Sequence, residues 1–122
     1  MAINRQTFKK TALNTAAIVK NSSWIGMMRV RMTDEEMARY GACNTFRFLN
    51  KSALKIRIRF GWNNEGGAPF YDMEGNGILN ITIDDGLLSY GFDIMDLDAS
   101  TDVAIGEFQY VMSRVEQIPE GI

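Results

Sequence analysis

The sequence predicts a mainly β protein, either a β-sandwich or a small barrel, with one or two short helices and a basic N-terminal arm. Three observations predict it. Short segments of alternating apolar and polar residues recur along the chain, turn residues separate them, and helical spacing is rare. The chain has 122 residues, 46% of them hydrophobic, which fits one domain with its own core. We divide it into an arm or short helix at 1–20 and a single β-rich domain at 21–122.

Residues 1–20 contain four basic residues and no acidic one. Phe8, Ala12, Ala16 and Val19 recur at the spacing of one helix face, so the segment forms either a short amphipathic helix or an extended arm. The pattern of a secretory signal peptide is absent. No stretch reaches the roughly 20 apolar residues that cross a bilayer, so we expect no membrane partner.

The next segment predicts a strand followed by a helix. Residues 28–32, with the sequence MRVRM, alternate strictly, as a strand with one buried face does. Thr33 and Glu36 then form a capping box, in which each side chain bonds to the backbone of the other residue. With Gly41 as the stop signal, we expect a helix over about 34–40.

Two strands are predicted at 45–48 and 54–60. The second, LKIRIRF, is the clearest in the chain, because apolar side chains occupy one face and Lys55, Arg57 and Arg59 the other. The connecting residues 50–52, with the sequence NKS, predict a hairpin connection between them.

The remainder of the chain alternates between turn signals and strand patterns. Residues 61–77 contain five glycines, three asparagines and a proline, and predict a long irregular loop of the kind that often serves function or assembly. Strands are predicted at 78–83 and 88–94, separated by a turn at 84–86, and Gly91 marks a bulge in the second. Residues 103–115 fit a strand and a helix, and periodicity alone does not decide between them.

Charge is divided sharply along the chain. Residues 1–60 carry 12 of the 13 Lys and Arg but 3 of the 15 Asp and Glu, whereas residues 61–122 carry 1 and 12. Such a split is typical of a bipolar molecule, or of two charged faces held against each other. It favours an assembling protein over an enzyme.

The chain has no histidine and one cysteine, Cys43. This excludes Ser-His and Cys-His nucleophiles, imidazole metal sites and the usual structural zinc sets. We expect Cys43 to be a small buried residue in a reducing compartment. The aspartates of the second half lie at turns, where their hydrogen bonds alone favour them. We therefore predict a protein that is not an enzyme.

The basic side chains of the predicted strands form the first candidate site. If these strands are neighbours, their outward side chains make one positive surface. It could bind nucleic acid, could be solvated or paired within the molecule, or could contact the acidic half of the next subunit. The sequence pI near 5.1 counts against nucleic acid. The predicted interface residues are Arg29, Arg31, Arg47, Lys55, Arg57, Arg59 and Trp62.

The acidic segment 96–107 is the second candidate site, because its spacing resembles the twelve-residue EF-hand calcium loop. Thr101 stands where that motif has glycine, and a similar opening at 72–77 has Ile83 at its twelfth position, which cannot bind calcium. The alternative is a pair of Asp/Gly turns between strands. Calcium is the one possible cofactor that the sequence suggests, and its ligands would be Asp96, Asp98, Ser100, Asp102 and Glu107.

The segment 50–61, NKSALKIRIRFG, is similar to a stretch in small β-structured virion proteins of bacteriophages, where a turn of Asn and Ser leads into a strand ending Arg-Phe-Gly. The resemblance implies a capsid- or tail-associated protein of the virion, assembled in the host cytoplasm and repeated in a symmetric shell or ring. We therefore predict a non-enzymatic homo-oligomer that packs against copies of itself, a larger shell protein or other virion proteins. The alternatives are a calcium-binding module using residues 96–107 and a nucleic-acid binder using the basic strand face.

Overall fold

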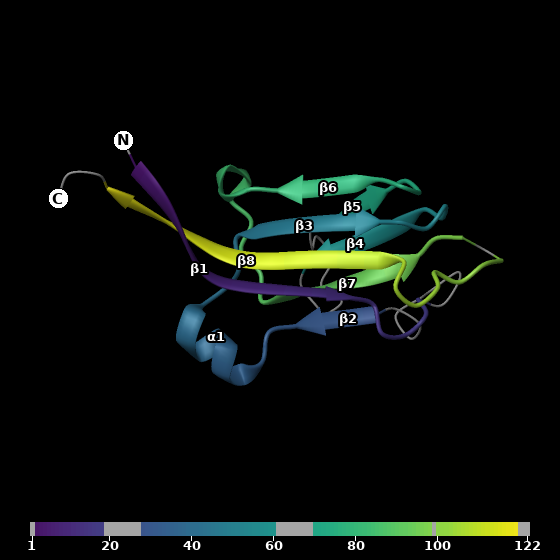
Figure 1. Cartoon of the computed structure of the whole chain (residues 1–122), viewed down its shortest axis with the longest axis horizontal. Coiled ribbons are helices and arrows are strands. Elements are labelled where there is room, and N and C mark those ends of the chain that lie inside the picture. Colours follow the sequence, from purple (N-terminus) through teal and green to yellow (C-terminus); the bar gives the residue numbers. More distant parts are fainter. Residues whose placement is uncertain (1, 19–27, 61–69, 99, 120–122) are drawn as a thin grey trace.

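The computed structural model describes residues 2–18, 28–60, 70–98 and 100–119. They form two four-stranded antiparallel sheets packed face to face, with one short helix at the end of the molecule (Figure 1). The first sheet has the order β1-β8-β3-β6, and the second has the order β2-β7-β4-β5. The predicted fold class is confirmed as a β-sandwich.

The first sheet consists of β1 (Ala2–Leu13), β8 (Phe108–Pro119), β3 (Thr45–Asn50) and β6 (Ile78–Ile81). The second consists of β2 (Met28–Arg31), β7 (Gly91–Asp96), β4 (Ile56–Phe60) and β5 (Phe70–Met73). The helix α1 (Asp34–Tyr40) follows β2, and the short 3₁₀ turn η1 (Ile83–Asp85) follows β6. Because each sheet has an even number of antiparallel strands, its two edge strands run in opposite directions.

Phenylalanine rings fill the space between the two sheets. Phe48 of β3 meets Phe92 of β7 with ring centroids 4.8 Å apart, and Phe46 meets Phe60 of β4 at 4.9 Å. These edge-on contacts between the sheets are the favourable arrangement of aromatic pairs. The alternating patterns at 45–48 and 54–60 therefore identified the core face correctly. The fully buried rings are Phe46, Phe48, Phe60, Phe92 and Phe108.

The predicted helix and its cap are confirmed. Thr33 Oγ1 accepts a hydrogen bond from the Glu36 N–H at 3.1 Å, and the Thr33 N–H donates to Glu36 Oε1 at 2.8 Å. Gly41 ends α1 with φ +76°, a conformation that favours glycine, and its N–H donates to the Met37 carbonyl.

The helix interpretation of residues 1–20 is wrong, since β1 is a strand that pairs with β8 along its length. Phe8 and Ala12 are four residues apart, and four is a multiple of the two-residue repeat of a strand, so their spacing fits one face of either structure. Pairing with β8 decided between them. Residues 103–115 fit both a strand and a helix, and the structure shows a strand there, β8, which begins at Phe108. Val19 lies outside the described residues.

The predicted hairpin at 50–52 is also wrong. β3 and β4 belong to different sheets, so this segment crosses from one layer to the other. Buried Asn50 stabilises the crossing: its Nδ2 donates to the carbonyls of Leu54 and Glu74, and its Oδ1 accepts the Ser52 N–H. The side chain supplies the bonds that hairpin pairing would otherwise have made.

Two further strand boundaries differ from the sequence prediction. The expected loop at 61–77 contains β5, while residues 61–69, including Trp62, lie outside the described residues. β7 begins at Gly91, after the exposed Leu88 and Tyr90. Gly91 is in regular register with Arg31, and a Cβ there would overlap the Val30 carbonyl, so the glycine permits close approach of β2 rather than a bulge.

β1 and β8 continue beyond the body of the sandwich as a two-stranded ribbon (Figure 1). β3 pairs with β8 as far as Ser113, whereas β1 remains paired with β8 out to Pro119, past a bulge near Gln6. At the ribbon tip, Ile3 lies opposite Ile118, and the two residues are 54% and 37% exposed. The ribbon therefore presents apolar side chains to solvent.

Candidate functional site at the open sides of the sandwich

The predicted basic residues do not share one surface. Arg29 and Arg31 lie on β2, and Arg57 and Arg59 lie on β4, in the second sheet. Arg47 is exposed on the outer face of β3, in the first sheet. A single positive surface would require all of these strands to be neighbours in one sheet. β3 lies in the other sheet from β2 and β4, so this prediction is wrong for Arg47.

Buried Asp93 of β7 lies at the centre of the ion pairs on the second sheet. Its two oxygens accept hydrogen bonds from Arg29 Nε and Arg59 Nη2, each at 3.1 Å. Arg59 was predicted as an interface residue, but it is only 8% exposed.

Two more ion pairs lie between β4 and β5. Arg57 forms a two-pronged pair with Asp72 at 2.7 and 3.1 Å, and these bonds lower the pKa of Asp72. Lys55 Nζ lies 3.7 Å from Glu74 Oε1. Each of these pairs joins the basic half of the sequence to the acidic half. The charge split along the sequence is therefore partly neutralised within one chain, and does not alone imply contacts between chains.

The acidic segment at 96–107 forms Asp turns. Asp96 Oδ1 accepts the Asp98 N–H at 2.8 Å, and Asp98 Oδ2 accepts the N–H groups of Ser100 and Thr101. These bonds lower the pKa of Asp98. Within the described ranges, no group of three or more Asp, Glu, Cys or His is placed to hold a metal ion. The calcium ligand set of Asp96, Asp98, Ser100, Asp102 and Glu107 is therefore not brought together.

Asp96 is fully buried at the end of β7. Burial raises the pKa of its carboxyl group, and the nearby charges of Asp98 and Asp102 add to the increase.

Cys43 is buried, as expected, with its Sγ 3.7 Å from the sulfur of Met32. Burial raises the pKa of the thiol to about 12. A thiol in this environment is not ionised at neutral pH and is a packing group rather than a nucleophile.

The sandwich has two open sides, where the edge strands of the two sheets lie next to each other (Figure 1). We call the side formed by β1 and β2 the basic side, and the side formed by β5, β6 and η1 the acidic side. Both strands of the basic side come from residues 1–33, which contain no Asp or Glu. Both strands of the acidic side come from residues 61–113, which contain no Lys or Arg. The fold thus places β1 and β2 on the opposite side of the molecule from β5 and β6, while β7 and β8 lie between them and pair with β2 and β1.

Several of these edge charges are engaged within the chain. Lys10 pairs with Glu36 at 3.2 Å, and Arg29, Asp72 and Glu74 belong to the pairs above. Lys9 on β1 and Asp84 in η1 are exposed. The charged residues of the basic side are Arg5, Lys9, Lys10, Arg29 and Arg31, and those of the acidic side are Asp72, Glu74, Asp84 and Asp85.

Apolar side chains are exposed at the same edges. Leu13 at the end of β1 is 44% exposed, and Ile78 at the start of β6 and Phe70 at the start of β5 are each 55% exposed. β6 has the sequence ILNI, with neither a charged side chain nor a proline to prevent pairing with another strand. Among the described strands, β1 and β6 each pair on one side only.

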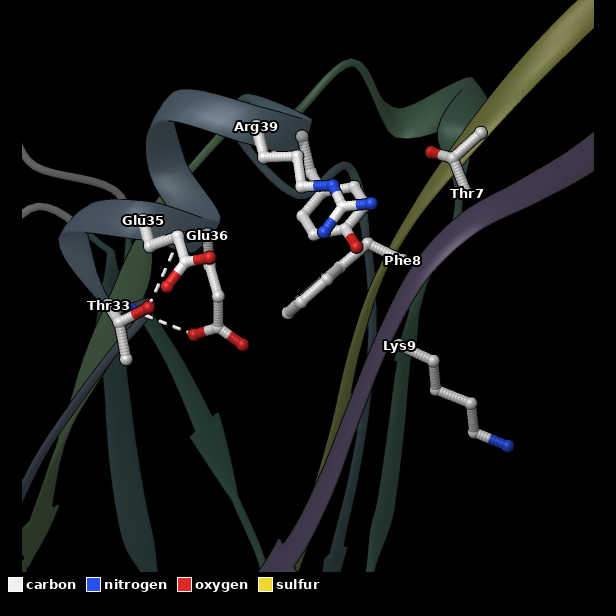
Figure 2. A pocket seen from close by; sticks show the side chains of 8 residues that line it. Thr7, Phe8, Lys9, Thr33, Glu35, Glu36 and Arg39 are labelled. Atoms are coloured by element: carbon white, nitrogen blue, oxygen red, sulfur yellow. Dashed lines mark hydrogen bonds between the residues drawn. The ribbon is translucent and has the colours of Figure 1, made fainter.

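A groove of about 510 Å³ separates β1 from α1 (Figure 2). The Phe8 ring points from β1 into this groove and lies 5.0 Å from the ring of Tyr40. The Arg39 guanidinium lies over the Tyr40 ring at 5.4 Å, and Lys9 lies on the opposite rim. The groove therefore lies beside the open edge of β1, with Arg39 on the α1 side, while the Lys9 side chain points from β1 away from the groove.

Glu35 and Glu36 also line this groove. Glu36 is held by the Thr33 N–H and by Lys10, and its bond to the Thr33 backbone is the main cause of its lowered pKa. A second groove of about 280 Å³ lies between β1 and β2, and Lys10, Arg29 and Arg31 are among its lining residues.

Comparison with protein-family models, curated proteins and solved structures found no match. No helix in the part of the chain that the structure describes is long and apolar enough to cross a membrane. What the protein does must therefore be inferred from its own geometry. The open sides are the candidate site that the sequence prediction missed, although the acid-free segment 1–33 and the base-free segment 61–113 were visible signals.

Proposed function

We propose that the protein is a non-enzymatic structural subunit that assembles with copies of itself, as a capsid- or tail-associated component of a virion. The observation that carries this proposal is the opposite charge of the two open sides of one sandwich. A subunit with both surfaces can present its basic side to the acidic side of the next copy. Such head-to-tail contacts repeat, and they close into a ring or continue along a lattice.

The β1/β8 ribbon supports the same proposal. An isolated two-stranded ribbon is marginally stable in water, and this one has Ile3 and Ile118 exposed at its tip. A neighbouring subunit or a larger shell protein that covered the tip would remove these apolar side chains from solvent. The ribbon thus provides a second contact beyond the body of the sandwich.

Nucleic-acid binding is the weaker proposal. Arg29, Arg57 and Arg59 each pair with a carboxylate of the same chain. Such pairing reduces the positive charge that a phosphate backbone would meet.

Light scattering coupled to size-exclusion chromatography tests the proposal. We expect a species of several subunits at low ionic strength, and a smaller one at about 1 M salt, where the Debye length falls to about 3 Å. The protein at equal concentration in both buffers is the matched comparison. A monomer at every salt and protein concentration would contradict assembly with copies of itself.

A further inference from the structure

We infer that β6 of one copy pairs with β1 of the next copy, so that the first sheet continues from subunit to subunit. This inference rests on the proposed function, because it identifies the contact by which the subunits assemble. The partner is a second copy of this chain, and the mode of contact is strand addition at an open sheet edge.

Strand direction permits this contact without rotating either subunit. The first sheet is antiparallel throughout and has four strands, so β6 runs opposite to β1. A second copy that is shifted sideways along the sheet places its β1 beside β6 of the first. The two strands are then antiparallel, which matches the rest of the sheet.

The register of the sheet indicates which residues meet. Ile78 is level with Leu49, Leu49 with Gln109, and Gln109 with Leu13. Two residues away along each strand, Asn80 is level with Arg47, Arg47 with Val111, and Val111 with Thr11. A sideways shift without stagger therefore places Ile78 opposite Leu13 of the next copy, and Asn80 opposite Thr11.

The backbone groups at these positions face the right way. The Asn50 N–H donates to the Gly77 carbonyl, so the backbone groups of Gly77 face β3. Because this direction alternates from one residue to the next, the N–H and C=O groups of Ile78 and Asn80 point away from β3. The Asn14 N–H donates to the Phe108 carbonyl, so those of Thr11 and Leu13 point away from β8. Both proposed pairs are therefore hydrogen-bonded pairs of an antiparallel ladder.

The side chains at this contact complement one another. Ile78 and Leu13, both large and exposed, would cover each other on the outer face of the sheet. The η1 turn that follows β6 carries exposed Asp84, and would reach the groove beside β1 where Lys9 and Arg39 lie (Figure 2). Asp84 would meet unlike charges at Lys9 and Arg39, beside the two glutamates that also line this groove.

The second sheet supports the same shift. Arg29, Asp93, Arg59 and Phe70 are level with one another across β2, β7, β4 and β5. A sideways shift places exposed Phe70 beside Arg29 of the next copy. Phe70 already has the Arg57 guanidinium 4.6 Å from its ring centroid, which shows that its face accepts a cation.

Contact between two basic edges is disfavoured. Two β1 edges would bring Arg5, Lys9 and Lys10 of both copies together; β1 itself has no acidic residue, and Lys10 pairs with Glu36 of α1. Two β6 edges paired antiparallel would place their η1 turns at opposite ends of the contact, so the aspartates of η1 would not meet. The charges of β1 therefore disfavour contact between two basic edges and favour contact of β1 with β6.

Disulfide formation between Leu13→Cys and Ile78→Cys tests the inference. Opposed Cα atoms in a hydrogen-bonded antiparallel pair are about 5.5 Å apart, within the range of about 4.4–6.8 Å that a disulfide spans. Both positions are exposed, so the substitutions should leave the fold intact, and circular dichroism checks this. Under mild oxidation we expect an equimolar mixture of the two variants to form a disulfide dimer containing one chain of each.

Each variant alone, and the unaltered chain with buried Cys43, are the controls and should give no disulfide dimer. A disulfide dimer of Leu13→Cys alone would show that β1 meets β1, and one of Ile78→Cys alone would show that β6 meets β6. Either result overturns the inference. An assembled mixture that forms no disulfide also overturns it, while the proposed function stands. A monomer by light scattering before oxidation would overturn both.

Discussion

The two open sides of the sandwich are edges of the same two sheets, but they are built differently. The basic side has a long strand, β1, which carries its charges along its length and has α1 beside it. The acidic side has two strands of four residues each, and η1 supplies charge beyond the end of β6. The edge strand β1 of the basic side carries charged side chains along its length. The edge strand β6 of the acidic side is short and apolar, and the acidic residues of η1 follow it. From this difference we expect the basic edge to be a poor partner for its own kind and a good partner for the acidic edge.

The interior charges of the second sheet differ from both edges. Asp93 is 1% exposed and joins two arginines, so its role is to neutralise charge within the subunit. The edge charges at Lys9 and Asp84 are exposed, and contribute little to the stability of a single chain. Substitution of the buried Asp93 should therefore lower the free energy of unfolding. Substitution of an exposed edge charge should leave that free energy nearly unchanged and should weaken assembly.

The largest effect is expected for Asp93→Ala. Removing this carboxylate breaks a buried ion pair with Arg59, and breaking such a pair typically costs about 3–5 kcal/mol. Urea denaturation of the monomeric protein at high salt measures the loss. The matched control, Asp84→Ala, should change the free energy of unfolding by less than about 0.5 kcal/mol. Equal losses in the two variants would contradict the distinction between interior and edge charges.

A smaller effect, of opposite sign, is expected for Asp96→Asn. Since burial raises the pKa of Asp96 in the folded protein, the folded state retains a proton that the unfolded chain releases between the two pKa values. The free energy of unfolding therefore falls as pH rises through that interval. An amide keeps the oxygen that accepts the Asp98 N–H but carries no charge.

Thermal denaturation at two pH values measures this effect. We expect Asp96→Asn to have a higher Tm than the unaltered protein at pH 7, and no advantage at pH 3, below both pKa values. The matched control is Asp98→Asn, because hydrogen bonds lower the pKa of Asp98 and the change should lower the Tm at pH 7. A Tm that falls equally in both variants would mean that Asp96 is stabilising as a carboxylate.

The elements that local rules determine were predictable from the sequence. α1 begins and ends where its capping box and Gly41 indicate, and the alternation at 54–60 identified the core face of β4. What local pattern cannot show is which strands are neighbours. Residues 50–52 read as a hairpin because their turn chemistry is common to hairpins and to crossings between sheets, and the buried Asn50 side chain is what distinguishes the two.

The candidate site was only partly predictable for the same reason. Whether Arg57 and Arg59 face solvent or a carboxylate depends on β5 and β7, which lie next to β4 in space but later in the sequence. The spacing of residues 96–107 fits calcium ligands, yet the chain uses those oxygens to bind its own N–H groups. The opposite charges of the two open sides required both the sequence composition and the strand order.

The smallest effect is expected for Asp84→Lys. Exposed ion pairs contribute about 0.2–1 kcal/mol, so this change should weaken assembly by a factor of about 1.4 to 5 at low salt. Concentration-dependent light scattering measures it. The difference from the unaltered protein should vanish at about 1 M salt, because exposed charges are then screened. Persistence of the difference at high salt would show that Asp84 acts through packing rather than charge.

The most direct test of the central claim, that unlike edges meet, mixes two edge-blocked variants. Thr11→Pro and Asn80→Pro each remove an N–H that points away from its own sheet, which an edge strand tolerates. Thr11→Ala and Asn80→Ala retain that N–H and should assemble like the unaltered protein. Each proline variant alone should be a monomer by light scattering, whereas the mixture should form a dimer with one chain of each, because one intact β6 edge and one intact β1 edge remain. A mixture that stays monomeric beside an assembling unaltered protein, or a proline variant that assembles alone, would contradict the account.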